Sequence, residues 1–417
     1  MAQVDLTNVT DVGVQPGTLP ETMAAWVIRQ DREGPPTDAF QLEQIEVPEP
    51  GPFEVIVRVM AAGVNYNNVW AALGKPVSVF RYHPEEDHHI GGSDASGIVW
   101  KSGEGVTRWQ PGDEVVIHCN QASYEDPEVH GFDPLAAPSQ KIWGYETSWG
   151  SFAQFTKVQE QQLLHKPKSL AWEEAASYGL TYFTAYRMLI DRCELQAGHK
   201  VLIWGAAGGL GVFATQLCRM AGAQCVGVVS SDEKGELCMQ LGATGYINRN
   251  EFAGMMRKGG ETPEEEKERF AESRRFGKAV KEILGDSPDI VFEHVGQATF
   301  PTSVFVVKPF GKVVICAGTT GFNLDFDVRY LWMRQKQIIG SHFANAWECN
   351  KANELMDQGL IRPVLWRTMG FEGVGEAHQL MLENKHLGKI AILVGAGKEG
   401  LGKTAEGPGA IHAEVGA

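Results

Sequence analysis

Residues 204–211, Trp-Gly-Ala-Ala-Gly-Gly-Leu-Gly, form a glycine-rich segment of the kind that binds a dinucleotide. An apolar strand-like run precedes this segment, and a helix-like run, Val-Phe-Ala-Thr-Gln-Leu, follows it. Glycines at such a turn let the backbone approach a pyrophosphate, which the N-terminus of the next helix stabilises. The alternative is an ordinary strand–helix turn that binds nothing. The residues expected to form the loop are Gly205, Gly208, Gly209, Leu210 and Gly211.

The end of the second expected strand indicates which cofactor binds. Enzymes that use NAD commonly end this strand with Asp or Glu, which binds the ribose 2′-hydroxyl. Here Ser230 and Ser231 follow the strand, with Lys234 one helical turn later and Arg249 after the third strand. Hydroxyls and two cations favour the 2′-phosphate of NADPH, although both cations are otherwise ordinary surface residues. Asp232 fits this hypothesis only if it caps the helix and points away.

No ligand set for a catalytic zinc ion is apparent. Such an ion takes three N, S or O ligands and keeps one position open. Residues 92–97 read Gly-Ser-Asp-Ala-Ser-Gly, where zinc alcohol dehydrogenases carry a Gly-His-Glu pattern. Residues 63–68 read Gly-Val-Asn-Tyr-Asn-Asn, where those enzymes carry a cysteine. The first domain also holds four histidines and a cysteine, which follow no ligand spacing: His88, His89, His118, His130 and Cys119. We therefore expect no metal.

The order of the elements predicts two domains. From about residue 170, strand-like and helix-like runs alternate, which is typical of a Rossmann-type doubly wound parallel sheet. The apolar runs, including residues 337–345, are expected to be buried strands. We place this dinucleotide-binding domain at residues 176–345. Short β-rich runs separated by Gly and Pro over residues 23–112 indicate a barrel-like domain. The chain is expected to return to that domain, which then comprises residues 1–175 and 346–417.

Four segments are expected to lie outside the two cores. The first 20 or so residues form an arm or stay loose, and the Pro-, Asp- and Ser-rich residues 119–141 form a long loop. Residues 262–285 mix charges of both signs at helical spacing, which favours a solvated helix without chemistry. The Gly/Ala-rich tail from Lys398 is expected to be flexible.

Composition excludes several classes of partner. The net charge is −15, with 52 acidic and 37 basic residues, which disfavours binding to nucleic acid or anionic membranes. We see no signal-peptide pattern, and no apolar run reaches the roughly 18 residues of a membrane span. The seven cysteines are odd in number and never spaced Cys-x-x-Cys, which indicates reduced thiols. We therefore expect a soluble, cytoplasmic protein.

Residues 23–395 resemble the crotonyl-CoA (enoyl-CoA) carboxylase/reductases, a zinc-free family of the medium-chain dehydrogenase/reductase group. The resemblance implies that the β-rich catalytic domain is GroES-like and that the chain forms a homodimer or homotetramer. Two positions depart from the family pattern, namely Val295, where proline is expected, and Pro309-Phe310, where a basic residue and glycine are more common. The segments that carry the resemblance are 64–74, 91–100, 141–155, 202–217, 228–234, 289–296, 316–323 and 329–345.

The resemblance implies a reductive carboxylation. NADPH delivers hydride to Cβ of a 2-enoyl-CoA thioester, and the developing enolate attacks CO2 at Cα. Crotonyl-CoA would give ethylmalonyl-CoA, whereas a proton arriving first would give butyryl-CoA. One alternative is a zinc-free enoyl-CoA or quinone reductase that fixes no CO2. A second alternative is a cofactor-binding protein of the same fold without catalytic activity.

The family's CO2 contacts correspond by motif to Asn67, Tyr145, Glu146 and His342. The Asn67 amide and the His342 imidazole supply N–H donors for the oxygens of CO2, and the Tyr145 ring limits water entry. Ionised Glu146 would orient a water molecule or the His342 ring. Each residue also has a structural interpretation: Asn67 caps a turn, Tyr145 packs, Glu146 is a surface carboxylate and His342 is a core histidine.

Other candidate contacts lie towards the cofactor and the CoA moiety. Thr181 and Thr184 are expected at the nicotinamide, and the segment with Gly318 and Thr319 ends a strand at the edge where such sheets bind ligands. Arg329 is a candidate for a CoA phosphate or else an ordinary surface ion. Lys308 replaces the basic residue that is missing at 309–310.

Overall fold

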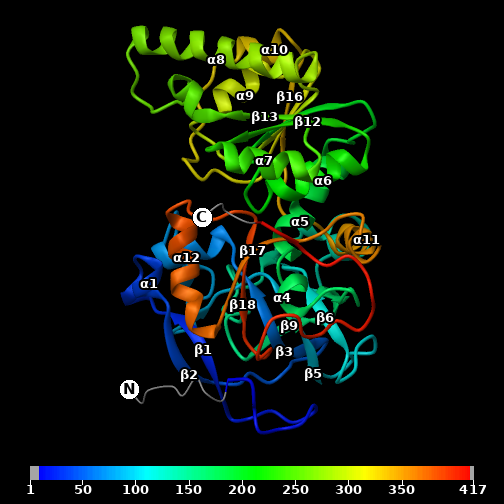
Figure 1. The fold of residues 1–417 in the computed structure, drawn as a ribbon. Helices are drawn as coiled ribbons and strands as arrows, with labels where there is room; N and C mark the ends of the chain where they lie inside the picture. The colour runs from blue at the N-terminus through cyan, green and yellow to red at the C-terminus, as the bar shows by residue number, and fades with distance from the viewer. Residues whose placement is uncertain (1–8, 414–417) are drawn as a thin grey trace. The chain divides into compact units, whose positions relative to one another are not determined.

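The computed structural model describes residues 9–413 and divides into two compact units (Figure 1). The first unit ends at Phe183 and resumes over Ala344–His412, and the second covers Thr184–Phe343. Within the described residues, no helix is long and apolar enough to cross a membrane.

The second unit is built on a six-stranded sheet in which all neighbouring strands are parallel. The strand order is β13-β12-β11-β14-β15-β16, so the order reverses between β11 and β14. Ligands bind at such a reversal, beyond the carboxyl ends of the strands. The predicted Rossmann-type fold is confirmed. The strands are β11 (Lys200–Trp204), β12 (Gln224–Val229), β13 (Gly245–Asn248), β14 (Ile290–Glu293), β15 (Lys312–Ile315) and β16 (Gln337–Gly340).

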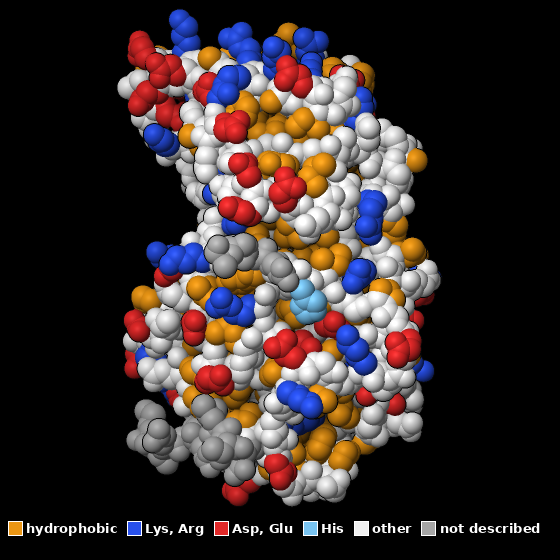
Figure 2. Space-filling model, viewed as in Figure 1, with side chains coloured by type: hydrophobic (Ala, Val, Ile, Leu, Met, Phe, Trp, Pro, Cys, Tyr) orange, Lys and Arg blue, Asp and Glu red, His pale blue; other side chains and the backbone are white. Residues whose placement is uncertain are grey.

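Helices between these strands bury an apolar core. Trp204 stacks on Phe276 of α8 with ring centroids 5.3 Å apart, and Phe252 meets the same ring edge-on. The solvated helix expected over residues 262–285 is α8, which Thr262 caps. Figure 2 shows acidic and basic side chains intermixed around it. The helices are α6 (Gly211–Met220), α7 (Asp232–Leu241), α8 (Pro263–Leu284), α9 (Phe300–Val306) and α10 (Arg329–Trp332).

The first unit contains an eight-stranded sheet centred on β3 (Glu54–Gly63), which pairs with β5, β9 and β18. Residues of β3 are buried along most of its length, and this fits a strand with partners on both edges. The predicted β-rich domain is confirmed. The other strands of the sheet are β5 (Ala95–Ser102), β6 (Glu114–Ile117), β9 (Phe155–Gln159), β10 (Leu163–His165), β17 (Val364–Met369), β18 (Lys389–Leu393) and β19 (Ile411–His412).

Smaller elements complete this unit. A three-stranded sheet has the order β2-β1-β4, and β7 pairs with β8. The strands are β1 (Thr22–Ile28), β2 (Gln41–Glu46), β4 (His89–Ile90), β7 (Asn120–Gln121) and β8 (Lys141–Ile142). The helices are α1 (Pro36–Ala39), α2 (Tyr66–Leu73), α3 (Glu128–Gly131), α4 (Trp172–Ala175), α11 (Ala346–Asp357) and α12 (Val374–Leu382), while α5 (Gly179–Tyr186) spans the boundary between the units.

Three sequence-based expectations are wrong or incomplete. The tail is not loose up to residue 413, because β19 pairs with β17 and Ala410 donates its N–H to Glu174 at 2.9 Å. The expected loop 119–141 contains β7 and α3. Strand β16 is not buried, because it lies at the sheet edge, where Ile338 is 38% exposed.

The N-terminal arm packs on the first unit from residue 9 onwards. The buried guanidinium of Arg58 donates to the Val9 carbonyl at 2.6 Å, and Gln154 donates to the same oxygen at 2.8 Å. Residues 1–8 of the arm lie outside the described residues.

Candidate active site

The glycine-rich loop follows β11 and leads into α6, as its sequence predicts. Gly205 adopts a left-handed φ of 56°, which turns the chain at the end of the strand. A Cβ on Gly211 would overlap the backbone of Ala206, so only glycine fits where the helix begins. Gly208, Gly209 and Leu210 are partly exposed between these two points. The loop therefore has the form that a pyrophosphate needs.

Two cations gather beyond the end of β12. The Lys234 ammonium is half-buried, and its pKa is lowered by burial and by the like charge of Arg249. Ser231, not Asp232, caps α7 by accepting the Lys234 backbone N–H, so the expected cap at Asp232 is wrong. Asp232 is the exposed first residue of the helix and accepts a hydrogen bond from Asn248 at 3.3 Å. Lys234 and Arg249 are close enough to repel each other, and a bound phosphate group would offset that repulsion. Lys234 and Arg249 suit the 2′-phosphate expected from the sequence, whereas Asp232 does not cap the helix as that hypothesis required.

The turn after β14 is organised by a buried carboxylate that sequence reasoning missed. Glu293 accepts hydrogen bonds from the N–H groups of Val295 (2.7 Å) and Gly296 (3.2 Å) and from the hydroxyls of Thr299 (2.9 Å) and Ser303 (2.7 Å). Burial raises the pKa of this carboxyl group. Proline has no N–H, so valine at 295 adds a hydrogen bond that the family's usual proline cannot make.

The loops after β11, β14 and β15 meet at the carboxyl edge of the sheet. The His294 imidazole bonds the Trp204 carbonyl at 2.9 Å, next to Gly205. The Thr319 N–H donates to the His294 carbonyl at 3.4 Å, and Gly318 packs closely on Gly296. The structure therefore brings the segment with Gly318 and Thr319 together with the glycine-rich loop.

Helix α5 carries both threonines expected at the nicotinamide. Thr181 and Thr184 are 8% and 5% exposed. The Thr181 hydroxyl is buried and has no hydrogen-bond partner among the described residues, so it is available to a ligand.

Asn67 lies in the first turn of α2, and it does not cap that helix, whose N-cap is Asn65. Its amide N–H donates to the Ser93 hydroxyl at 2.8 Å, and its amide oxygen accepts from Asn68 at 2.9 Å. The Asn68 oxygen in turn accepts the Gly92 N–H at 2.9 Å. The side chain of Asn67 is thus held in one orientation.

Tyr145 and Glu146 lie in the turn that follows β8. Glu146 is half-buried and accepts the Ile142 N–H at 2.7 Å, so it is not simply a surface carboxylate. Burial raises the pKa of the Tyr145 phenol, which stays protonated. Gly144, just before them, packs on Gly92 so closely that a Cβ would overlap the Gly92 carbonyl. The turn is therefore packed on the segment that binds Asn67.

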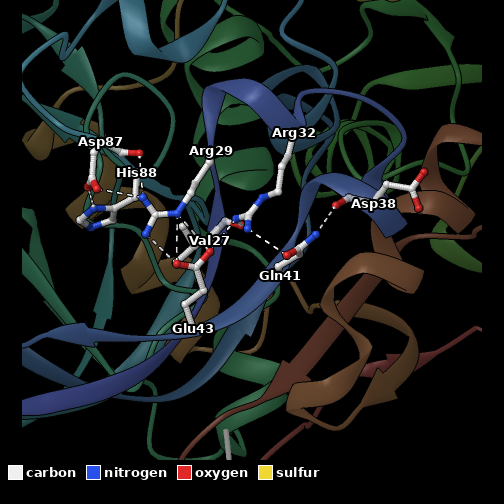
Figure 3. A network of polar contacts seen from close by, with 8 residues as sticks. All are labelled: Val27, Arg29, Arg32, Asp38, Gln41, Glu43, Asp87 and His88. Atoms are coloured by element: carbon white, nitrogen blue, oxygen red, sulfur yellow. Dashed lines mark hydrogen bonds and ion pairs between the residues drawn. The ribbon is translucent and has the colours of Figure 1, made fainter. Parts of the chain in front are cut away.

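A polar network joins Arg29 to Glu43, Asp87 and His88 (Figure 3). Arg29 bridges two carboxylates, Glu43 at 2.7 Å and Asp87 at 2.8 Å. His88 bonds the same Asp87 carboxylate at 2.7 Å. The network therefore ties Asp87 and His88 to β2 and to the residue that follows β1. Tyr82, earlier in the same segment, faces Tyr145 with ring centroids 6.3 Å apart.

The remaining candidates belong to the second unit. His342 follows β16 and is exposed, so it is not a core histidine. Lys308 pairs with Asp289, and Arg329, whose side chain is 73% exposed, pairs with Asp327 at 2.6 Å. The assignments of His342 to CO2 and of the two cations to CoA stay predictions.

Comparisons with known proteins agree with this architecture. Residues 51–168 match the model for an alcohol dehydrogenase GroES-like domain, and residues 209–358 match the model for a zinc-binding dehydrogenase. A crotonyl-CoA carboxylase/reductase from Cereibacter sphaeroides is 51% identical over 405 residues, covering 94% of this chain and 93% of that protein. The chain belongs to the crotonyl-CoA carboxylase/reductase family.

Solved structures support this membership. The crotonyl-CoA carboxylase/reductase AntE in complex with NADP has a TM-score of 0.88 and 48% identity, covering 93% of this chain and 98% of that one. The 2-octenoyl-CoA carboxylase reductase CinF, in complex with NADP and 2-octenoyl-CoA, has a TM-score of 0.87 and 37% identity, covering 93% and 91%. The family predicted from the sequence segments is confirmed.

The name of the second family model, zinc-binding dehydrogenase, raises the question of a metal site. Among the described residues, no group of three or more His, Cys, Asp or Glu side chains is placed to hold a metal ion. At the position where a Gly-His-Glu pattern was sought, Asp94 instead forms a buried ion pair with Lys389 at 2.9 Å. Asp94 also accepts from Asn65 at 2.9 Å and from the Leu180 N–H at the start of α5. The sequence offered no signal for this pair, because Lys389 lies almost 300 residues from Asp94 along the chain.

Proposed function

We propose that the protein catalyses the NADPH-dependent reductive carboxylation of crotonyl-CoA, or another short 2-enoyl-CoA, to the 2-alkylmalonyl-CoA. Crotonyl-CoA, CO2 and NADPH would give ethylmalonyl-CoA and NADP⁺, with butyryl-CoA as the side product. The proposal rests on family membership and on one observation in particular. The Asn67 amide is held by hydrogen bonds at a glycine-lined segment on which the turn with Tyr145 and Glu146 packs.

NADPH would supply the hydride that reduces Cβ of the enoyl thioester. The glycine-rich loop would accommodate the pyrophosphate, and Lys234 and Arg249 would receive the 2′-phosphate with Ser230 and Ser231. The Thr181 hydroxyl has no partner among the described residues, so it can bind the cofactor. We propose Thr184 and the segment with Gly318 and Thr319 as neighbours of the nicotinamide. Arg329 and Lys308 would bind CoA phosphates in competition with their present carboxylate partners.

The fate of the enolate depends on the groups around its Cα. CO2 is a weak, uncharged ligand, so it must be held by hydrogen-bond donors while water is kept away. Asn67 has one N–H bound to Ser93, and the described residues give its second N–H no partner. Tyr145 keeps its phenol protonated, because burial raises its pKa, and its aromatic ring lies beside that of Tyr82. These groups of the first unit would favour carbon–carbon bond formation over protonation, and we propose His342 as a further donor to CO2.

Product analysis tests the proposal. The purified protein is incubated with crotonyl-CoA, NADPH and ¹³C-bicarbonate, and both acyl-CoA products are quantified by mass against the NADPH consumed. We expect labelled ethylmalonyl-CoA to dominate and butyryl-CoA to increase when bicarbonate is withdrawn. Butyryl-CoA alone at saturating bicarbonate would identify a simple enoyl reductase. Tight NADPH binding without any turnover would identify a non-catalytic protein.

We also propose that the protein is a homo-oligomer, assembled from dimers in which β16 pairs with its counterpart. This edge strand leaves Ile338 38% exposed, and the adjacent Trp332 and Met333 are 64% and 61% exposed. An unpaired edge flanked by apolar side chains is suited to pairing with a second copy. Light scattering should give a dimer or tetramer mass, and Ile338→Lys should lower it. A monomer at micromolar concentration would contradict this assembly.

A cytoplasmic location is proposed for the same protein. None of the seven cysteines forms a disulfide, and six of them are buried, which suits a reducing compartment. Fractionation of the producing cells, with the activity assayed in each fraction, tests this location.

A further inference from the structure

A chain of three hydrogen bonds runs from the backbone of the 91–93 segment through two neighbouring amides of α2. The Gly92 N–H donates to the Asn68 amide oxygen at 2.9 Å. The Asn68 amide nitrogen donates to the Asn67 amide oxygen at 2.9 Å, and the Asn67 amide nitrogen donates to the Ser93 hydroxyl at 2.8 Å. We call this set, Gly92, Asn68, Asn67 and Ser93, the amide relay.

The amide relay has a fixed direction, because its first donor is a backbone N–H that cannot act as an acceptor. The Gly92 N–H obliges Asn68 to turn its oxygen towards the loop. The nitrogen of Asn68 must then face Asn67, which has to present its oxygen in return. The nitrogen of Asn67 is therefore on the other side, with one N–H bound to Ser93.

The surroundings of Asn68 make this arrangement rigid. Asn68 and Ser93 are both fully buried. A Cβ on Gly91 would overlap the Asn68 amide oxygen, so the loop approaches that oxygen as closely as glycine allows. An amide in such a site has no room to rotate and no water to replace its partners, so its two ends are not interchangeable.

We propose that Asn68 and Ser93 are positioning residues that keep the donor end of Asn67 directed at the CO2-binding position. The inference rests on the proposed function, since it gives the Asn67 N–H a ligand. A free asparagine amide would present its oxygen or its nitrogen to that position. The amide relay prevents Asn67 from presenting its amide oxygen, so the oxygen atoms of CO2 always meet an N–H donor. Neither residue touches a reactant; both act through Asn67.

The test reverses the polarity of the relay with Asn68→Asp. The carboxylate still accepts the Gly92 N–H, but it cannot donate to Asn67, so the Asn67 amide turns over and exposes its oxygen. The ratio of ethylmalonyl-CoA to butyryl-CoA should fall by about tenfold or more, the KM for CO2 should rise, and NADPH oxidation should fall much less. Ser93→Ala, which removes the acceptor at the other end, should lower the ratio in the same direction. It also serves as the second probe if Asn68→Asp does not fold.

Two controls separate positioning from general damage. Asn353→Asp removes a buried amide donor, the one bound to the His165 carbonyl at 2.9 Å, at a place away from the relay. It should lower the melting temperature without changing the product ratio. A double variant, Asn67→Ala with Asn68→Asp, should have the product ratio of Asn67→Ala alone, because Asn68 acts only through Asn67.

The outcomes are distinct. If Asn67→Ala leaves the product ratio unchanged, the proposed CO2 site itself is wrong, and the relay has no catalytic meaning. If Asn67→Ala lowers the ratio but Asn68→Asp and Ser93→Ala do not, the CO2 site stands and the positioning inference is overturned. The positioning inference is also overturned if the effects of Asn67→Ala and Asn68→Asp on the product ratio add fully in the double variant. Asn68 would then act independently of Asn67.

Discussion

Replacement of Lys389 by methionine should unfold the first unit at a much lower denaturant concentration. Its ammonium group is 1% exposed and pairs at 2.9 Å with the Asp94 carboxylate, which is 0% exposed. It also donates to the Val64 carbonyl at 3.0 Å and to the Asn65 amide oxygen. Burial lowers the pKa of Lys389, and the charge of Asp94 opposes that shift. Lys389→Met therefore leaves a buried carboxylate without its counter-ion.

The loss of unfolding free energy in Lys389→Met depends on the hydrogen bonds that the Asp94 carboxylate retains. Removal of one partner from a buried ion pair costs about 3–5 kcal/mol, because the other charge stays buried without compensation. Asp94 retains hydrogen bonds from Asn65 and from the Leu180 N–H, which offset part of this cost. We therefore expect a loss at the lower end, about 3 kcal/mol. Asp94→Asn combined with Lys389→Met removes the buried charge and should regain at least about 1 kcal/mol.

Tryptophan fluorescence in urea measures this loss selectively. Of the eleven tryptophans, only Trp204 and Trp332 lie in the second unit, so the signal reports mainly on the first. The midpoint for Lys389→Met should lie well below that of the unaltered protein, with the double variant between them. If the double variant is no more stable than Lys389→Met, the uncompensated charge is not the cause of the loss. A single variant as stable as the unaltered protein would refute the reasoning entirely.

Three further predictions concern the cofactor, acid stability and metal. Lys234→Ala should reduce the preference for NADPH over NADH by about tenfold in kcat/KM, because one charge-assisted hydrogen bond to the 2′-phosphate is lost; an equal loss with both cofactors would contradict this. Burial lowers the pKa of His378 to about 4, against 6.5 in the unfolded chain. The stability that the neutral, buried His378 ring contributes is therefore complete above pH 6.5 and is lost as the pH falls towards 4. That contribution is roughly 3 kcal/mol, and denaturant titrations should show a shallower decline over this interval for His378→Gln than for the unaltered protein. Prolonged chelation should leave NADPH oxidation unchanged, whereas stoichiometric zinc lost in parallel with activity would overturn the metal-free prediction.

Much of the fold could be predicted because strong local patterns agree with it. The glycine-rich segment lies between β11 and α6, and the Thr262 capping box with Pro263 marks the start of α8. The tail was mispredicted because its Gly/Ala-rich composition says nothing about the Glu174 and Lys168 groups that bind it. The exposure of β16 was missed for a related reason, since an apolar run does not reveal whether a strand lies at the centre or at the edge of a sheet.

The candidate site could be predicted only where single side chains carry a chemical signal. Asn67, Tyr145 and Glu146 are assigned by the family motif, and Lys234 with Arg249 by the lack of a terminal acid on β12; these assignments stay predictions. Asn68 and Ser93 were passed over, although both stand in the segments where zinc ligands were sought. Their role depends on bonds between α2 and the 91–93 segment, and no one-dimensional spacing encodes which amide end faces which partner.

The segment from residue 92 to 97 shows how a site of this fold is organised without metal ligands. Three consecutive residues there each bind a different neighbour: Gly92 binds Asn68, Ser93 binds Asn67, and Asp94 binds Lys389 and the first turn of α5. The first two contacts set the orientation of the Asn67 amide, and the third anchors the helix that carries Thr181. In the function proposed above, this short segment would link the proposed carboxylation site to the helix that carries Thr181, and the Lys389 ammonium pairs with its third residue. Substitution of Asp94 should therefore slow hydride transfer and lower CO2 capture together. Substitution of Asn68 or Ser93 should lower CO2 capture much more than hydride transfer.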